Sequence, residues 1–200
     1  MQEGQSAYTC HDIVDKEMLD YALQFAAKAH KGQLRKGTDT PYIVHPLEVV
    51  DIVSEMTEDT EILVAAALHD VLEDTDVKPE EIRENFGENV LAMVQAETEN
   101  KRSDKPPEET WFIRKKEMIV KLAEEPLSVK MIVLADKLSN LRATKKDYHE
   151  VGHKVWDRFH VTDYRLHRWY YTSIGEHLKE LAHTKEYKEF QQLCKEVFYE

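Results

Sequence analysis

The stretch TEILVAAALHDVLEDT, residues 60–75, decides the fold of this chain. Its apolar part, residues 62–68, is the longest apolar run in the sequence, and as a helix it is apolar on nearly every side. Such a helix must be buried, so we expect it to lie at the centre of the fold, capped by Thr60 and continuing to Thr75. The run is too short to cross a bilayer.

The sequence on both sides of this segment also indicates helices. Apolar residues recur at helical spacing, and prolines stand where several of the helices would begin. No alternation of apolar and polar residues is long enough for a strand, and no internal repeat is present. We therefore predict an all-α bundle of about nine or ten helices. The further expected helices are 16–30 (capped by Asp15), 45–56, 79–87, 88–99, 111–124, 126–148, 161–183 and 185–198, with a polar loop over 31–42.

The length of 200 residues suits one domain, which we expect to cover residues 1–200 with its core at about 16–183. Residues 101–110, KRSDKPPEET, contain two prolines and no apolar residue, so we predict a mobile loop at about 100–110 rather than a domain boundary. Cys10 and Cys194 belong to no metal-binding pattern, and we expect two reduced thiols. With no secretory pattern at the start, the expected compartment is the cytoplasm.

The charge balance restricts the partners of the protein. With 27 basic and 39 acidic residues, the formal net charge is −12. Broad binding to nucleic acid or to a membrane surface relies on excess cations, so we expect neither partner. An anionic small molecule remains compatible with this charge if it binds in a local basic pocket. The sequence leaves the oligomeric state open.

Four polar residues stand in apolar surroundings. His45 precedes a helix, His69 and Asp70 follow the apolar run, and Asp136 lies within the apolar segment IVLADKL. Burying such groups is costly unless they are paired or bind a metal. Two imidazoles and two carboxylates suit Mn²⁺, Fe²⁺ or Zn²⁺ and would leave positions for water and a substrate oxygen. The alternative for each residue taken alone is a hydrogen-bonded structural role.

Glu73 and Asp74 follow His69 and Asp70 at a spacing of four. On one continuous helix this spacing stacks the two pairs on one face, where they would repel each other unless a cation lies among them. We expect Glu73 to orient or deprotonate a water, with Asp74 assisting. The alternative is that both acids are solvated at the end of the helix, where negative charge is mildly unfavourable.

Three extended motifs, in order, carry a family resemblance. AHKGQLRKGTDTPYIVHP (29–46), ALHDVLEDT (67–75) and VLADKLSNLR (133–142) resemble the hydrolase domain of RelA/SpoT-type guanosine polyphosphate hydrolases, within the HD superfamily of metal-dependent phosphohydrolases. TWFIRKKE (110–117) resembles the small stand-alone members. The resemblance implies an HD-type helical domain with a central metal site. It implies one divalent ion per chain, usually Mn²⁺, with Fe²⁺ or Zn²⁺ as alternatives, held by His45, His69, Asp70 and Asp136.

The same resemblance implies a set of substrate contacts. Arg35 would stack on the base, Lys36 would approach phosphate, and Asn140 would lie near the ribose. Arg114 and Lys115 are candidates for further phosphate contacts, the alternative being an ordinary charged helix face. Tyr42 either lines the pocket or closes the loop.

The function implied is metal-dependent hydrolysis of the 3′-pyrophosphate of guanosine 3′,5′-bis(diphosphate), ppGpp or pppGpp, to GDP or GTP and pyrophosphate. This reaction ends the stringent-response signal. Acidic residues Glu73 and Asp74 match the pair associated with hydrolysis. One alternative is hydrolysis of another 3′- or 2′-phosphorylated nucleotide such as NADPH. Another is a nucleotide-binding regulatory module without turnover. Larger family members add a synthetase domain, which we do not expect in these 200 residues.

Overall fold

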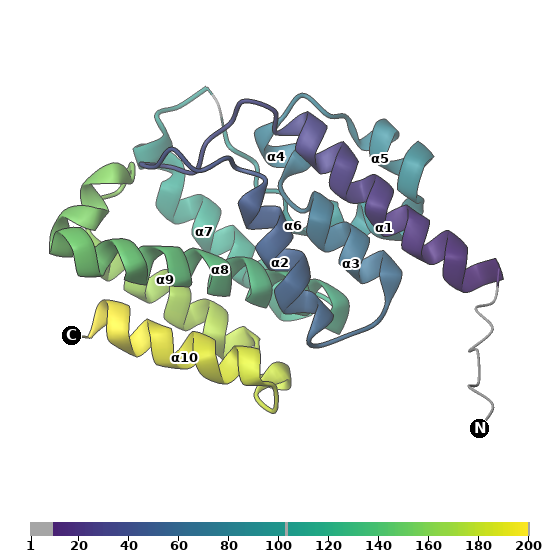
Figure 1. The fold of residues 1–200 in the computed structure, drawn as a ribbon. Helices are drawn as coiled ribbons and strands as arrows, with labels where there is room; N and C mark the ends of the chain where they lie inside the picture. The colour runs from purple at the N-terminus through teal and green to yellow at the C-terminus, as the bar shows by residue number, and fades with distance from the viewer. Residues whose placement is uncertain (1–9, 103, 200) are drawn as a thin grey trace.

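The computed structural model describes the backbone of residues 10–102 and 104–199, and the side chains from Glu17 onward within those ranges. This part of the chain forms ten α-helices and two short 3-10 helices and contains no strand, so the predicted all-α fold is confirmed (Figure 1). The helices are α1 (Cys10–Ala29), α2 (Val44–Ser54), α3 (Thr60–Leu68), α4 (Val71–Asp74), α5 (Pro79–Phe86), α6 (Glu88–Glu97), α7 (Pro107–Glu124), α8 (Leu127–Val151), η1 (Gly152–Arg158), α9 (Tyr164–His177), η2 (Lys179–Leu181) and α10 (Lys185–Phe198).

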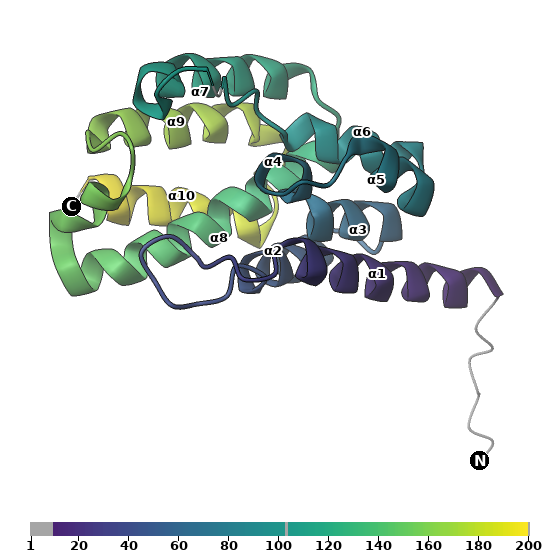
Figure 2. The same cartoon turned by 90° about the horizontal axis from the view of Figure 1, so that it is seen from above.

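Helix α3 lies at the centre of one half of the molecule, as the apolar run predicts. Residues 64–68 are at most 1 % exposed. Helices α1, α2, α6 and α8 all pack against α3. In the other half, α8, α10, α9 and α7 pack in succession, each against the next (Figure 2). The long helix α8 belongs to both groups and thereby joins them.

The start and the end of the central helix both differ from the prediction. The cap is Asp59, not Thr60: its extended backbone lets the carboxylate accept hydrogen bonds from the amides of Glu61 and Ile62. The helix ends at Leu68 instead of reaching Thr75, and α4 forms a separate turn. His69 and Asp70 lie at the break. The predicted stacking of Glu73 and Asp74 over these residues on one continuous helix is therefore wrong.

Several other boundaries also shift. Helix α1 already begins at Cys10, ahead of the expected cap Asp15, whose side chain lies outside the described residues. Helix α7 begins at Pro107, a favourable first position, so the expected loop is shorter and Thr110 is buried. Whether that loop is mobile stays a prediction.

The C-terminal region is more divided than expected. Helix α8 ends at Val151 and is capped by Gly152, whose φ of +61° favours glycine. Residues 152–158 form the unexpected 3-10 helix η1, and the expected helix over 161–183 is divided into α9 and η2. Helix α10 packs the buried Phe190 against the rest of the core. No helix in the described part of the chain is both long and apolar enough to cross a membrane.

Candidate functional site

The structure brings together the four polar residues that the sequence places in apolar surroundings. His45 lies in the first turn of α2, His69 and Asp70 lie at the break between α3 and α4, and Asp136 lies in α8. His45 Nε2 is 3.0 Å from Asp136 Oδ1 and 3.6 Å from Asp70 Oδ2. His69 Nε2 is 2.9 Å from Asp70 Oδ2 and 3.9 Å from Asp136 Oδ1. Both histidines are at most 2 % exposed.

The hydrogen bond at the far side of His69 decides which ring nitrogen is available. Nδ1 lies 2.8 Å from the carbonyl oxygen of Ala66, which can only accept, so Nδ1 must donate. In the neutral ring Nε2 then carries a lone pair that faces the site. This atom is buried and makes no hydrogen bond, although Asp70 Oδ2 lies 2.9 Å away. A lone pair facing a carboxylate oxygen calls for a positive charge between them.

Two consecutive hydrogen bonds orient the ring of His45. Ser139 donates its hydroxyl proton to Glu48 Oε2 at 2.8 Å, so the same oxygen accepts from His45 Nδ1, also at 2.8 Å. Nε2 of His45 is left without a proton and faces the two aspartates. A hydrogen bond from the ring nitrogen that faces away from the site is typical of metal-binding histidines; here its acceptor is a hydroxyl that is itself bonded to a carboxylate.

The pKa shifts of His69 and Asp70 also indicate that this site favours an added positive charge. Burial opposes a charge on His69, yet the facing carboxylate of Asp70 outweighs it and raises the pKa of His69 to about 9. Burial would raise the pKa of Asp70, but His69 and His45 hold it well below its usual range. The cluster therefore favours an added cation, whether a proton or a metal ion.

Three neighbouring side chains hold the carboxylates of Asp70 and Asp136 in place. Tyr42 donates its hydroxyl to Asp70 Oδ2 at 2.5 Å, and Asn140 donates its amide to Asp136 Oδ1 at 2.6 Å. The second oxygen of Asp136 pairs with Lys137. Ligand atoms of His45, His69 and Asp70 all lie within 4.8 Å of one another, and Asp136 Oδ1 lies within 3.9 Å of both Nε2 atoms. This mixed nitrogen and oxygen set fits a divalent metal ion.

The side chains of His45, His69, Asp70 and Asp136 form a cage for such an ion. A cavity of about 140 Å³ borders this cage, and Glu73, Glu97 and Glu99 form its acidic wall. Glu73 is one of its lining residues. Burial, together with the carboxylates of Glu99 and Asp70, raises the pKa of Glu73 to about 7. Its Oε2 accepts a hydrogen bond of 3.2 Å from the backbone amide of Glu99. Glu73 therefore reaches the site even though the predicted continuous helix is broken.

Glu97 is a second acid in this wall that the sequence analysis does not identify. Its side chain is buried, and burial raises the pKa to about 8. Its Oε1 has no hydrogen-bond partner among the described residues. In the sequence Glu97 ends an ordinary amphipathic helix, so no local signal marks it.

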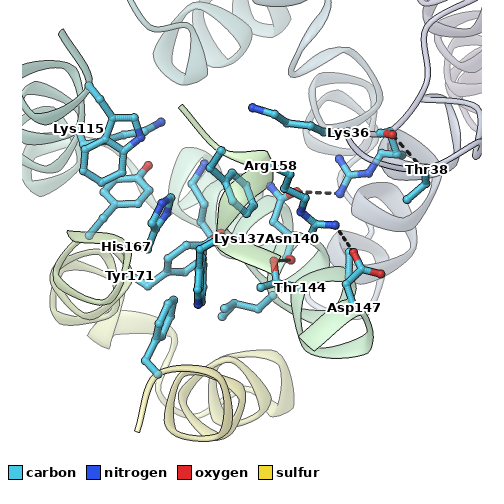
Figure 3. Close-up of a pocket in the computed structure, with 18 of the residues that line it drawn as sticks. Lys36, Thr38, Lys115, Lys137, Asn140, Thr144, Asp147, Arg158, His167 and Tyr171 are labelled. Atoms are coloured by element: carbon cyan, nitrogen blue, oxygen red, sulfur yellow. Dashed lines mark hydrogen bonds and ion pairs between the residues drawn. The ribbon is translucent and has the colours of Figure 1, made fainter. Parts of the chain in front are cut away.

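A larger cavity of about 480 Å³ adjoins the smaller one. Arg35, Tyr42, Lys115, Lys137 and Asn140 line both cavities, so the two are parts of one site. Figure 3 shows Arg158 near the middle of the larger cavity, with Lys115 and His167 to one side and Thr38 and Asp147 to the other. The remaining walls of the larger cavity include Lys36, Asp74, Trp111, Trp156, Phe159, Tyr170 and Tyr171.

Most of the predicted substrate contacts line the larger cavity, and Arg114 lies outside it. Arg35 donates to Asn140 Oδ1 at 2.8 Å, which links it through Asn140 to Asp136. Lys36 lines the larger cavity, as does Asp74. Asp74 does not line the smaller cavity; one carboxylate oxygen lies 3.4 Å from the Tyr42 hydroxyl and the other pairs with Lys101 at 2.5 Å.

Of the two basic candidates on α7, Lys115 lines the cavities and Arg114 does not. Lys115 lines both cavities and pairs with Glu99 at 2.6 Å. Arg114 lines neither and instead holds Glu99 from the other side at 2.8 Å. Arg114 thus supports the acidic wall. The cavity residues that sequence reasoning did not assign to the site include Lys137, which adjoins the predicted ligand Asp136, and Arg158, which no motif marks.

Comparisons with known proteins show which family this chain belongs to. A family model described as an HD domain matches residues 22–159. The guanosine-3′,5′-bis(diphosphate) 3′-pyrophosphohydrolase of Aquifex aeolicus is 33 % identical over 98 % of this chain, which spans 28 % of that relative. The enzyme of the same name, MESH1, from Homo sapiens is 35 % identical over 72 % of this chain and 76 % of its own length.

A solved structure extends the likeness to the fold. It is described as a metazoan ortholog of SpoT that hydrolyzes ppGpp, and it is 27 % identical to this chain. The match has a TM-score of 0.70 and covers 98 % of this chain and 97 % of the other. The chain therefore belongs to the HD domain family, in the group that contains the guanosine-3′,5′-bis(diphosphate) 3′-pyrophosphohydrolases.

Proposed function

We propose that this protein is a metal-dependent hydrolase that converts ppGpp and water to GDP and pyrophosphate, and pppGpp to GTP in the same way. The observation that carries the proposal is the direct junction of two unlike cavities. A buried cage that favours an added cation borders a larger cavity with cationic and aromatic walls. The larger volume, about 480 Å³, suits a nucleotide-sized ligand. The relatives named for this reaction support the same assignment.

We assign the metal as one Mn²⁺ per chain, held by His45, His69, Asp70 and Asp136. The nitrogen and oxygen donors also accept Fe²⁺ or Zn²⁺, and the resemblance of the motifs favours manganese. When bound, the ion supplies Lewis-acid polarisation of a phosphoryl oxygen and acidifies a water.

Glu73 is assigned as the general base. Its carboxylate borders the cage, and a pKa of about 7 makes it an effective proton acceptor near neutral pH. It takes a proton from water as the water oxygen bonds to the phosphorus on the ribose 3′ oxygen. The bond from that phosphorus to the 3′ oxygen breaks, and this oxygen takes up a proton. Asp74 faces the larger cavity, on the side where we place the nucleoside, and assists there.

The nucleoside is assigned to the larger cavity. The planar guanidinium of Arg35 can stack on the base, and Asn140 lies between Arg35 and the metal ligand Asp136, where a ribose would be placed. The net charge of −12 supports a free nucleotide as the partner and not nucleic acid or a membrane. The cytoplasm stays the proposed compartment, and the buried, unbridged thiol of Cys194 is compatible with it.

The direct test is a hydrolysis assay on the purified protein loaded with Mn²⁺. We expect GDP and pyrophosphate in equal amounts from ppGpp, and we expect a chelator to abolish the reaction. A panel that includes pppGpp, NADPH and other nucleotides with 2′- or 3′-phosphates identifies the preferred substrate. Faster release of phosphate from NADPH than of pyrophosphate from ppGpp would replace the proposal with the alternative hydrolase.

Two other results contradict the proposal in different ways. Tight binding of ppGpp without any product over hours would indicate a regulatory nucleotide-binding module. Turnover that persists in demonstrably metal-free protein would refute the metal mechanism while leaving the substrate assignment intact.

A further inference from the structure

Two cations from distant parts of the sequence each lie near the same aromatic ring, Phe159, in the larger cavity. Lys36 Nζ lies 5.5 Å from the centre of the Phe159 ring, and Arg158 Cζ lies 5.1 Å from it. Both side chains line the larger cavity and neither lines the smaller one (Figure 3). The ring attracts each cation weakly, but it cannot neutralise two of them.

The charge of this pair is incompletely compensated. Arg158 pairs with Asp147 through one terminal nitrogen, while its Nε is buried without a hydrogen-bond partner among the described residues. Lys36 forms no ion pair within the same part of the chain. Burial and the charge of Arg158 both lower the pKa of Lys36. A cavity wall that contains both a buried N–H donor without an acceptor and an unpaired ammonium is a favourable place for an anion.

The geometry around Arg158 is held in place before any ligand arrives. Asp147 fixes its terminal nitrogen, and Gly37 lies against its aliphatic part, where a Cβ would be 3.3 Å from Arg158 Cδ. Gly37 has a φ of +77°, a conformation that other residues rarely adopt. The loop that carries Lys36 is thus packed directly on Arg158. Such preorganisation lowers the entropic cost of binding a ligand.

The position of the pair relative to the cage indicates which anion it would bind. Arg35 and Asn140 line both cavities, and therefore lie between the cage and the part of the cavity lined by Arg158. A nucleotide whose 3′-diphosphate reaches the cage and whose ribose lies near Asn140 still has a second phosphate group to place. We propose that Arg158, together with Lys36, binds the 5′-diphosphate and makes the site selective for nucleotides phosphorylated at both positions. This inference rests on the proposed function.

Binding of GDP and guanosine to the purified 200-residue chain in Mn²⁺ buffer tests the inference without requiring turnover. Arg158→Gln should weaken GDP binding roughly tenfold or more, as expected for a lost charge-assisted contact, and should leave guanosine binding unchanged. The matched control is Arg165→Gln, because Arg165 is 72 % exposed in its side chain and lines neither cavity. The control should leave both affinities unchanged.

A second variant covers the case in which Arg158→Gln fails to fold. Arg158→Lys keeps the charge but loses the planar fork, so we expect GDP affinity between that of the wild type and that of the Gln variant. In hydrolysis assays both variants should raise KM for ppGpp and leave KM for guanosine 3′-diphosphate, which lacks 5′-phosphates, unchanged. A lysine variant that matches the wild type in GDP affinity and in KM for ppGpp would overturn the inference.

The experiments distinguish a failure of the proposed anion site from a failure of the proposed hydrolase function. If the wild type does not hydrolyse ppGpp but Arg158→Gln still weakens GDP binding selectively, the anion site stands and the hydrolase assignment fails. If hydrolysis proceeds and Arg158→Gln binds GDP as well as the wild type does, the anion site is refuted. Equal losses of GDP and guanosine affinity would also refute it, because they indicate a structural defect and not loss of a phosphate contact.

Discussion

Glu97 provides a sharp test of the electrostatics of the acidic wall. Its carboxyl group is buried at the end of α6, one oxygen has no partner among the described residues, and burial raises its pKa from 4.5 to about 8. The folded protein therefore holds this proton more tightly than the unfolded chain does. We expect the stabilising contribution to be present in full below pH 4.5 and to be lost as the pH rises through about 8.

The expected change in unfolding free energy with pH follows from the size of the pKa shift of Glu97. One pKa unit corresponds to about 1.4 kcal/mol, so the full change between the two pKa values is on the order of 5 kcal/mol. Between pH 6 and pH 8.5 the wild type should lose roughly 2–3 kcal/mol of unfolding free energy through Glu97. Glu97→Gln cannot titrate and should lose none of it. The buried amide of the variant adds an offset of about 1–3 kcal/mol that does not depend on pH, so the slope is the informative quantity.

The assay is urea unfolding of wild type and Glu97→Gln at several pH values from 6 to 8.5, with chelator present. Glu73 titrates in both proteins, so its contribution cancels in their difference. Glu84→Gln is the matched control, because Glu84 is exposed on α5 and its variant should follow the wild type. If the stabilities of Glu97→Gln and the wild type change in parallel over this range, the buried carboxyl does not titrate as the structure requires.

Three further predictions concern the reaction. Glu73→Gln should retain Mn²⁺ and lose at least about a hundredfold in turnover of ppGpp; a rate within twofold of the wild type would remove Glu73 as the base. Because a base must be deprotonated and the pKa of Glu73 is raised to about 7, the wild-type rate should fall as the pH drops below 7; a rate that stays constant from pH 8 to pH 6 would contradict this. Ser139→Ala removes the acceptor that orients His45 and should weaken Mn²⁺ binding about 10- to 100-fold in a metal titration, and unchanged affinity would mean that this hydrogen bond is dispensable.

The sequence predicts most of the fold because its strongest signals are local. An apolar run such as residues 62–68 has few options other than burial, and a proline such as Pro79 marks a helix start through its own geometry. The cage is also accessible to sequence reasoning. A histidine or aspartate in apolar surroundings must be compensated, and the structure brings the four such residues together.

The missed features depend on tertiary contacts. Periodicity alone continues the central helix to Thr75, whereas the structure breaks it at His69 and Asp70, two residues that face the cage. Glu97 and Arg158 have ordinary neighbours in the sequence, so their burial in the cavity walls follows from the packing of α6 and η1. Neither position could be found without three-dimensional information.

The charges of the two cavities lead to a last prediction: binding of GDP in the larger cavity does not depend on a metal ion in the cage. Phosphate is repelled by the acids around the cage, among them Asp70 and Glu73, so the 3′-diphosphate should approach it only when a cation is bound. The part of the cavity around Lys36 and Arg158 has excess positive charge whether or not the cage is filled. Chelation should therefore abolish hydrolysis of ppGpp while changing the affinity for GDP by no more than a few fold. Calorimetric titration of GDP into metal-free and Mn²⁺-loaded protein measures this directly, and loss of GDP binding together with the metal would show that both phosphate groups depend on one site.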